Sequence, residues 1–390
     1  MKRKALAAAL ACAFLFASAA GSAFADGFDF IFNGIEYTTH LLSPLPLPTG
    51  LDVECLVPVT SFSAGPLAAD FRLSGGYEDR RLLRDISTGD PIAVPADVDG
   101  QYWYFSPNVQ WAAGLVQGFA QRDDEKGNLY EAFLLYRGRR DWQNTSLTSS
   151  YFSDLQGFMG HSVMLGFGYN SSKTDSRRVK SGDKFEASVE WGPNFANSNS
   201  VSNTDYFRLN LQDRYYYPLL SYGRPEDEGL NLFSLYLAGF VDTDYAGGGN
   251  GGNIPIYVLQ GFGGRTLRSS LGSGVRGYAS AAYDAAFKTV ANGEIRAVGP
   301  ALFSQGWCVP IAYLFADTGY YSNFSGSTNY TDKSGTISSA GAGLQFDILD
   351  LAYLGVDCGY CFPGDAGLFE LYKGSGASRF FWDIEFLLHF

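Results

Sequence analysis

The closing stretch FFWDIEFLLHF, residues 380–390, decides the fold. Apolar residues occupy all of its even positions, which are Phe380, Trp382, Ile384, Phe386, Leu388 and Phe390. Polar residues at odd positions are Asp383, Glu385 and His389. Because successive side chains of a strand point to opposite faces, the segment predicts a strand with one apolar and one mostly polar face. Such a strand suits a wall between lipid and water.

The other end of the chain predicts export. Three basic residues at positions 2–4 precede an uncharged apolar stretch, residues 5–20, and Ala23 and Ala25 then form a small-residue cleavage site. This layout is typical of a secretory signal peptide, so residues 1–25 are set apart from the fold. The closing strand resembles the C-terminal signal of bacterial outer-membrane proteins, which commonly ends in Phe. Together the two ends predict the bacterial outer membrane.

Composition and charge limit the partners. Removal of residues 1–25 takes away three basic and no acidic residues, so the formal charge changes from −12 to −15. Such acidity argues against nucleic acid as a partner. No later segment has the roughly 18 apolar residues of a membrane helix. The 31 Phe, 25 Tyr and 47 Gly fit a barrel in lipid or a large soluble β-protein.

Alternating or aromatic-rich segments separated by Gly, Asn, Asp and Ser predict the strands. Fourteen segments qualify: 51–62, 68–77, 103–120, 129–142, 161–170, 184–191, 206–217, 231–242, 255–262, 287–297, 309–320, 338–346, 351–362 and 380–390. Residues 28–39 and 146–158 offer two more. The fold class is therefore all-β, a transmembrane antiparallel β-barrel with 16 strands, or 14 as the alternative. Residues 26–50 form a short lead or the first strand, and residues 51–390 form the barrel.

An ordered set of motifs in the C-terminal third resembles the Omp85 superfamily. Residues Val275, Arg276, Gly277 and Tyr278 form a Val-Arg-Gly-Tyr motif within the expected loop 263–286. A strand carrying Glu294 follows, and then a Phe-x-Asp-x-Gly motif of Phe315, Asp317 and Gly319. The resemblance implies 16 strands, with the first motif on the loop between strands 11 and 12 and the second on strand 13. It covers residues 255–390, whereas the earlier residues share only the general barrel pattern.

The cost of placing a charge in lipid predicts that Arg276, Glu294 and Asp317 meet in the lumen of the barrel. A charge facing hydrocarbon costs about 2–4 kcal/mol, so Glu294 and Asp317 are expected to face the lumen. Arg276 on the loop could fold inward and bridge both carboxylates through its fork of donors. Gly277 would permit a tight backbone, and Gly319 would leave room for the loop on the wall. The resemblance implies that this contact pins the loop inside the barrel.

The resemblance also sets the functional expectations. It implies insertion or translocation of polypeptide, or of lipid, at the outer membrane, with a seam between first and last strands that opens sideways. Members usually carry periplasmic POTRA domains before the barrel, and residues 26–50 are too few for one. The alternative is a passive channel or structural barrel. Expected partners are outer-membrane lipid, the barrel-assembly machinery during biogenesis and a polypeptide substrate.

Enzymatic and metal-binding roles find little support in the residues. Only His40, His161 and His389 are present, and neither HExxH nor Gly-x-Ser-x-Gly occurs. A barrel-embedded hydrolase is thus the least favoured reading. The pair Cys358 and Cys361 has a redox spacing, but positions i and i+3 of a strand point to opposite faces. No catalytic residue, metal or other cofactor is expected.

Overall fold

The computed structural model describes most of the chain after residue 35. The described residues are 36–43, 50–64, 67–79, 82–84, 91–93, 101–116, 129–143, 158–174, 179–198, 204–223, 233–248, 254–265, 274–278, 285–303, 308–322, 334–348, 352–364, 376 and 378–389. The predicted signal peptide and the terminal Phe390 lie outside them.

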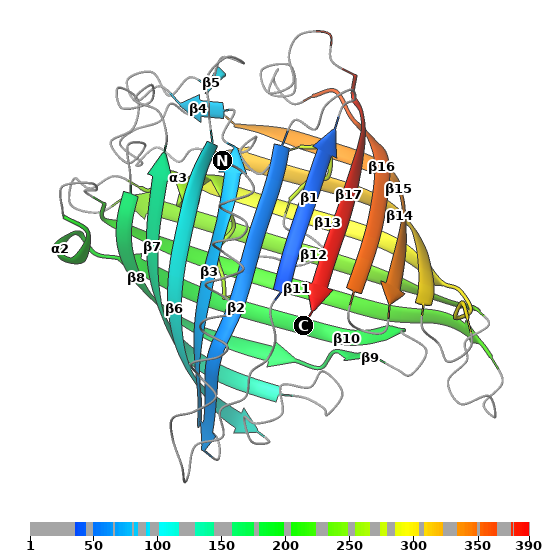
Figure 1. The fold of residues 1–390 in the computed structure, drawn as a ribbon, viewed down its shortest axis with the longest axis horizontal. Coiled ribbons are helices and arrows are strands. Elements are labelled where there is room, and N and C mark those ends of the chain that lie inside the picture. The colour runs from blue at the N-terminus through cyan, green and yellow to red at the C-terminus, as the bar shows by residue number, and fades with distance from the viewer. Residues whose placement is uncertain are drawn as a thin grey trace.

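The described strands close into one antiparallel barrel (Figure 1). Its strands are β1 (Glu36–Ser43), β2 (Gly50–Ala64), β3 (Leu67–Asp79), β6 (Gln101–Val116), β7 (Leu129–Gln143), β8 (Phe158–Asn170), β10 (Lys180–Gly192), β11 (Tyr206–Tyr222), β12 (Phe233–Gly248), β13 (Phe287–Val298), β14 (Cys308–Ser322), β15 (Ser334–Ile348), β16 (Ala352–Cys361) and β17 (Phe380–His389). Pairing of β10 with β11 and of β17 with β1 closes the ring. The predicted antiparallel all-β barrel is confirmed.

Five small elements among the described residues accompany this ring. The two-residue strand β9 (Lys173–Thr174) pairs with β10 at the barrel's edge. A separate hairpin joins β4 (Leu82–Arg84) to β5 (Pro91–Ala93). The helices α2 (Asn194–Asn197) and α3 (Ile256–Gln260) follow β10 and β12. No helix among the described residues is both long and apolar enough to span a bilayer.

The favoured count of 16 strands is not confirmed, because the described ring closes with 14, the alternative count. Residues 255–262 were expected to be a strand, but they contain α3. A short apolar run between glycines does not distinguish a strand from a buried helix, and here the run follows Pro255, whose carbonyl accepts from Val258 and Leu259. The first strand, β1, lies within residues 26–50, so the barrel begins before residue 51. Of 146–158, only Phe158 is described.

Buried and exposed side chains alternate along the strands, so each strand has an inner and an outer face. On β14 the buried residues include Tyr313, Phe315 and Asp317, whereas the intervening Leu314 is 62% exposed. Aromatic and aliphatic side chains are exposed on other strands too, among them Trp111, Leu165, Trp191 and Leu211. Because a water-soluble protein rarely exposes so much contiguous apolar surface, this exterior is suited to lipid.

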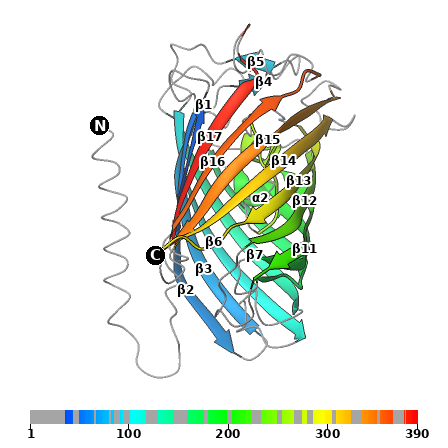
Figure 2. The ribbon, with the colours of Figure 1, turned by 90° about the vertical axis from the view of Figure 1, so that its right-hand side faces the viewer.

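The closing seam joins the two ends of the barrel. In Figures 1 and 2 the last strand, β17, lies directly beside β1. Pairing runs in register from Glu36 with His389 to Ser43 with Trp382. All 8 described residues of β1 pair with β17. The described part of the seam is therefore continuous.

Candidate functional site: a loop held inside the barrel

The connection from β12 to β13 folds back into the barrel. Its described parts, residues 254–265, 274–278 and 285–286, bond to inward-facing side chains of the wall. The helix α3 is packed at the start of this connection, where Val258 and Leu259 are fully buried. They form an apolar cluster with Tyr206 of β11 and Ala246 of β12, among others. Burial of these side chains stabilises the inward conformation.

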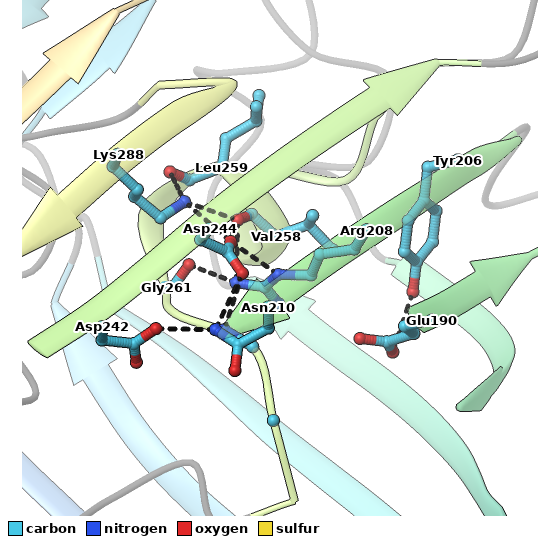
Figure 3. A network of polar contacts seen from close by, with 12 residues as sticks. Glu190, Tyr206, Arg208, Asn210, Asp242, Asp244, Val258, Leu259, Gly261 and Lys288 are labelled. Atoms are coloured by element: carbon cyan, nitrogen blue, oxygen red, sulfur yellow. Dashed lines mark hydrogen bonds and ion pairs between the residues drawn. The ribbon is translucent and has the colours of Figure 1, made fainter. Parts of the chain in front are cut away.

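Buried cations of the wall cap the carbonyls of α3 (Figure 3). Lys288 of β13 donates from Nζ to the carbonyl oxygens of Val258 at 3.0 Å and Leu259 at 2.8 Å. Arg208 of β11 donates to the carbonyl oxygen of Gly261 and, at 3.3 Å, to that of Val258. Cations are favourable at a helix C-terminus because the last carbonyls have no partner within the helix.

One carboxylate balances both cations. Asp244 Oδ2 lies 2.7 Å from Arg208 Nε and 3.5 Å from Lys288 Nζ. Its Oδ1 accepts from Asn210 at 3.1 Å and from the backbone N–H of Gly263 at 3.2 Å. An uncompensated charge in such a position would be very costly, so this network and the seated helix support one another.

Arg276 forms the most extensive contact between the loop and the wall. Its Nε and Nη2 donate to Asp317 Oδ2 and Oδ1 at 2.7 and 2.8 Å, and its backbone N–H donates to Oδ2 at 3.1 Å. Its Nη1 lies 2.8 Å from Glu294 Oε1 and 3.7 Å from Asp357 Oδ2. The guanidinium carbon lies 3.7 Å from the ring centre of Phe315. The arginine thus connects β13, β14 and β16.

The residues around Arg276 fit closely against the wall. Gly277 has φ +84°, and a Cβ there would meet the Phe381 ring and Cys361 Sγ. A Cβ at Gly319 would lie 3.0 Å from Cγ2 of Val275. Tyr278 donates from its hydroxyl to the carbonyl oxygen of Phe362 at 3.3 Å. Both glycines therefore sit where a side chain would obstruct the contact.

Electrostatics keeps Arg276 charged. Burial alone would lower the pKa of this guanidinium, but the hydrogen bond to Asp317 and the negative charges of Asp317, Glu294 and Asp357 raise it above its ordinary value. A buried cation with several anionic partners is stabilised in its charged form. Arg276 therefore stays protonated in this contact.

The sequence matches no protein-family model and no curated protein. Among solved structures, CdiB from Escherichia coli superposes with a TM-score of 0.50 at 10% identity, covering 94% of this chain and 68% of that chain. BamA from Haemophilus ducreyi lacking POTRA domains 1–3 gives a TM-score of 0.46 at 12% identity, covering 95% and 76%. This chain therefore shares the β-barrel fold of CdiB.

The position of the loop in the barrel bears on the resemblance seen in the sequence. Five ring strands, β13 to β17, follow the loop, as the resemblance implies for a loop between strands 11 and 12 of 16. The ring has two strands fewer than expected, and both are missing before the loop. When strands are counted back from the C-terminus, the Val-Arg-Gly-Tyr motif lies on the expected loop. When they are counted from the N-terminus, it does not, because two strands are missing before it.

The structure places the remaining named residues as follows. On β17, Phe380 is 70% exposed and Trp382 and Ile384 are half-buried; the side chains of Phe386 and Leu388 are not described. On β16, Cys358 is exposed and Cys361 is buried, so the pair points to opposite faces.

Sequence reasoning missed several contributors to this site. They are Asp357 and Phe381 beside Arg276, and Arg208, Asp244 and Lys288 around α3. Each of these residues lies on the inward face of its strand. The alternation of polar and apolar residues could have placed charged ones such as Asp357 on that face. No local pattern, however, indicates which distant segment meets them.

Proposed function

We propose that this barrel inserts or translocates polypeptide at the outer membrane, with the described residues 254–265, 274–278 and 285–286 of the loop between β12 and β13 as an internal plug. The observation that carries the proposal is the buried cluster in which Arg276 joins Asp317 and Glu294. Ion pairs to three strands would hold such a plug at rest, and transport would require the plug to move.

The seam supplies the second part of the proposal. Eight described residue pairs join β1 to β17. In the described ring this pairing joins two strands that are not consecutive along the chain, so no connecting turn holds them together and the seam can part without distorting a turn. We infer that it opens sideways to deliver polypeptide into lipid. The apolar exterior and the closing strand point to outer-membrane lipid and the barrel-assembly machinery as further partners.

The test is removal of the protein from its cell. Quantitative proteomics of outer-membrane and secreted fractions is compared between the wild type, a deletion strain and strains complemented with wild-type or Arg276→Ala protein. We expect the deletion to deplete particular membrane or secreted proteins, the wild-type copy to restore them and Arg276→Ala to restore them poorly. Unchanged fractions would contradict the proposal and favour a passive channel or structural barrel.

A further inference from the structure

A second arginine of the same loop binds the opposite part of the wall. Arg265 donates from its backbone N–H and its Nε to Glu186 Oε1 and Oε2 of β10, each at 2.8 Å. Its Nη1 forms an ion pair with Glu131 of β7. Its guanidinium carbon lies 4.0 Å from the ring centre of Phe133. All three charged side chains are at most 13% exposed, so the contact belongs to the interior.

The wall is shaped for this arginine. Gly168 of β8 is in register with both Glu131 and Glu186, so a glycine separates the two carboxylates across three neighbouring strands. A Cβ at Gly168 would lie 2.8 Å from Arg265 Nη2. The missing side chain therefore provides the space that the guanidinium occupies. Two acids, one glycine and one aromatic ring make a matched receptor for a planar cation.

The backbone before Arg265 is also secured. Gly263 donates its N–H to Asp244 and accepts at its carbonyl from Gln212 at 2.8 Å. The carbonyl of Gly264 accepts from Arg137 Nη2 at 2.9 Å, and Gly264 has φ +94°. This chain segment is therefore directed toward β7 and β10 by contacts on both of its sides.

The contact of Arg265 parallels that of Arg276. Each guanidinium meets carboxylates from at least two strands and lies over a phenylalanine ring, Phe133 or Phe315. Arg265 binds β7 and β10, whereas Arg276 binds β13, β14 and β16. The two sets of strands are separated in the ring by β11 and β12 on one side and by β17 and β1 through β6 on the other.

We propose that Arg265 is a second positioning residue, which ties the loop to the β7–β10 wall while Arg276 ties it to the β13–β16 wall. The described residues before and after positions 266–273 are then held at two separate places on the wall. Release of one arginine contact leaves the other in place, so movement of the loop away from both walls requires both contacts to part. The inference rests on the proposed function only in treating this opening as the transport step.

Single-channel recording in planar bilayers tests the inference through a double-mutant cycle. The proteins compared are wild type, Arg265→Ala, Arg276→Ala and the double variant. The control is Arg140→Ala, which removes an arginine from β7, the strand that carries Glu131. Because each arginine contact is a buried ion cluster, we expect each single loss to raise the open probability by at least about tenfold and the double loss to raise it further. The control should gate as wild type does.

Two further variants separate positioning from folding. Glu186→Gln keeps the size of the acceptor but removes its charge, and Arg265→Lys keeps the charge but lacks the planar fork, so both should open the channel less than Arg265→Ala. They also carry the test if Arg265→Ala does not fold. Wild-type gating in every Arg265 and Glu186 variant, or a double variant identical to Arg276→Ala, would overturn the inference. An unchanged proteome after gene deletion would contradict the proposed function in transport. It would not affect the double-mutant cycle, which tests only whether Arg265 holds the loop.

Discussion

At the scale of single residues, the plug depends on buried charges that balance one another. Asp317 is fully buried at its side chain, and Arg276 supplies three hydrogen bonds to it. Removing one partner of a buried ion pair is far more damaging than replacing both, because the remaining charge stays buried without compensation.

Substitution of Asp317 therefore has a sharp expected outcome. Asp317→Ala should lower the free energy of unfolding by about 3–5 kcal/mol. Arg276→Lys should also be destabilising, since an ammonium cannot reproduce the bidentate fork. Urea unfolding in lipid vesicles measures both effects. Thr318→Ala, on the exposed face next to Asp317, is the matched control and should change stability by less than about 0.5 kcal/mol. Equal effects at positions 317 and 318 would contradict the cluster.

Gly277 provides a second residue-level test. Gly277→Ala combines a positive φ, which costs about 1–2 kcal/mol for an L-residue, with a clash against the Phe381 ring and Cys361. Gly376→Ala is the matched control, because Gly376 has φ +77° and nothing within 4 Å of its Cβ position. We expect Gly277→Ala to destabilise the barrel more than the control does in the same unfolding assay. If the two variants behave alike, the packing of Gly277 against the wall is wrong.

At the scale of elements, the alternation of apolar and polar residues predicted the strands of the barrel wall. It did not predict the helix α3 in the loop, where a strand was expected. The strands from β10 to β17 follow from inward and outward positions that repeat every two residues, which the membrane enforces on both faces. Residues 255–262 do not follow this alternation because α3 packs inside the barrel, where Val258 and Leu259 contact Tyr206 and Ala246. Its place is set by Arg208 and Lys288, which come from strands on either side of it in sequence. Such long-range pairs leave no local signal.

The seam between β1 and β17 offers a prediction at the same scale. Thr39 and Phe386 are register partners, so cysteines at these positions should form a disulfide in a variant whose native cysteines are replaced by alanine. We expect the cross-linked protein to fold, to fail in complementing the deletion strain and to regain activity on reduction. The control pair Thr318→Cys and Ser338→Cys joins β14 to β15, where the two hydroxyls lie 3.1 Å apart, and should leave activity unchanged. Full activity of the cross-linked seam would exclude sideways opening.

At the scale of the whole molecule, the exterior determines where the barrel can exist. Trp103, Trp111, Trp142 and Trp191 are exposed by 42–52% on the outer face. They are four of the six tryptophans in the chain. In vesicles of lipids with brominated acyl chains, intrinsic fluorescence should therefore fall strongly relative to the same protein in ordinary lipid. Equal intensity in the two lipids would show that this face does not contact hydrocarbon.

The count of strands also belongs to this scale. Sixteen strands were expected from the resemblance, and the closed ring has 14. Every chain segment before the loop reads as a strand or a connection with similar composition, so the sequence does not reveal where the ring closes. The C-terminal third was predictable because its motifs and its last strand define positions that can be counted.

The central claim is that the loop lies inside the barrel against β14, and one cross-link tests it most directly. A cysteine at Gly319 would place its Cβ near the side chain of Val275. In a protein lacking native cysteines, which removes competition from Cys361, we predict that Val275→Cys with Gly319→Cys forms a disulfide in intact cells, detected as a linked peptide by mass spectrometry. Val275→Cys with Thr318→Cys, on the outer face, should not. Absence of the first bond in a correctly folded barrel, or formation of the second, would contradict the account.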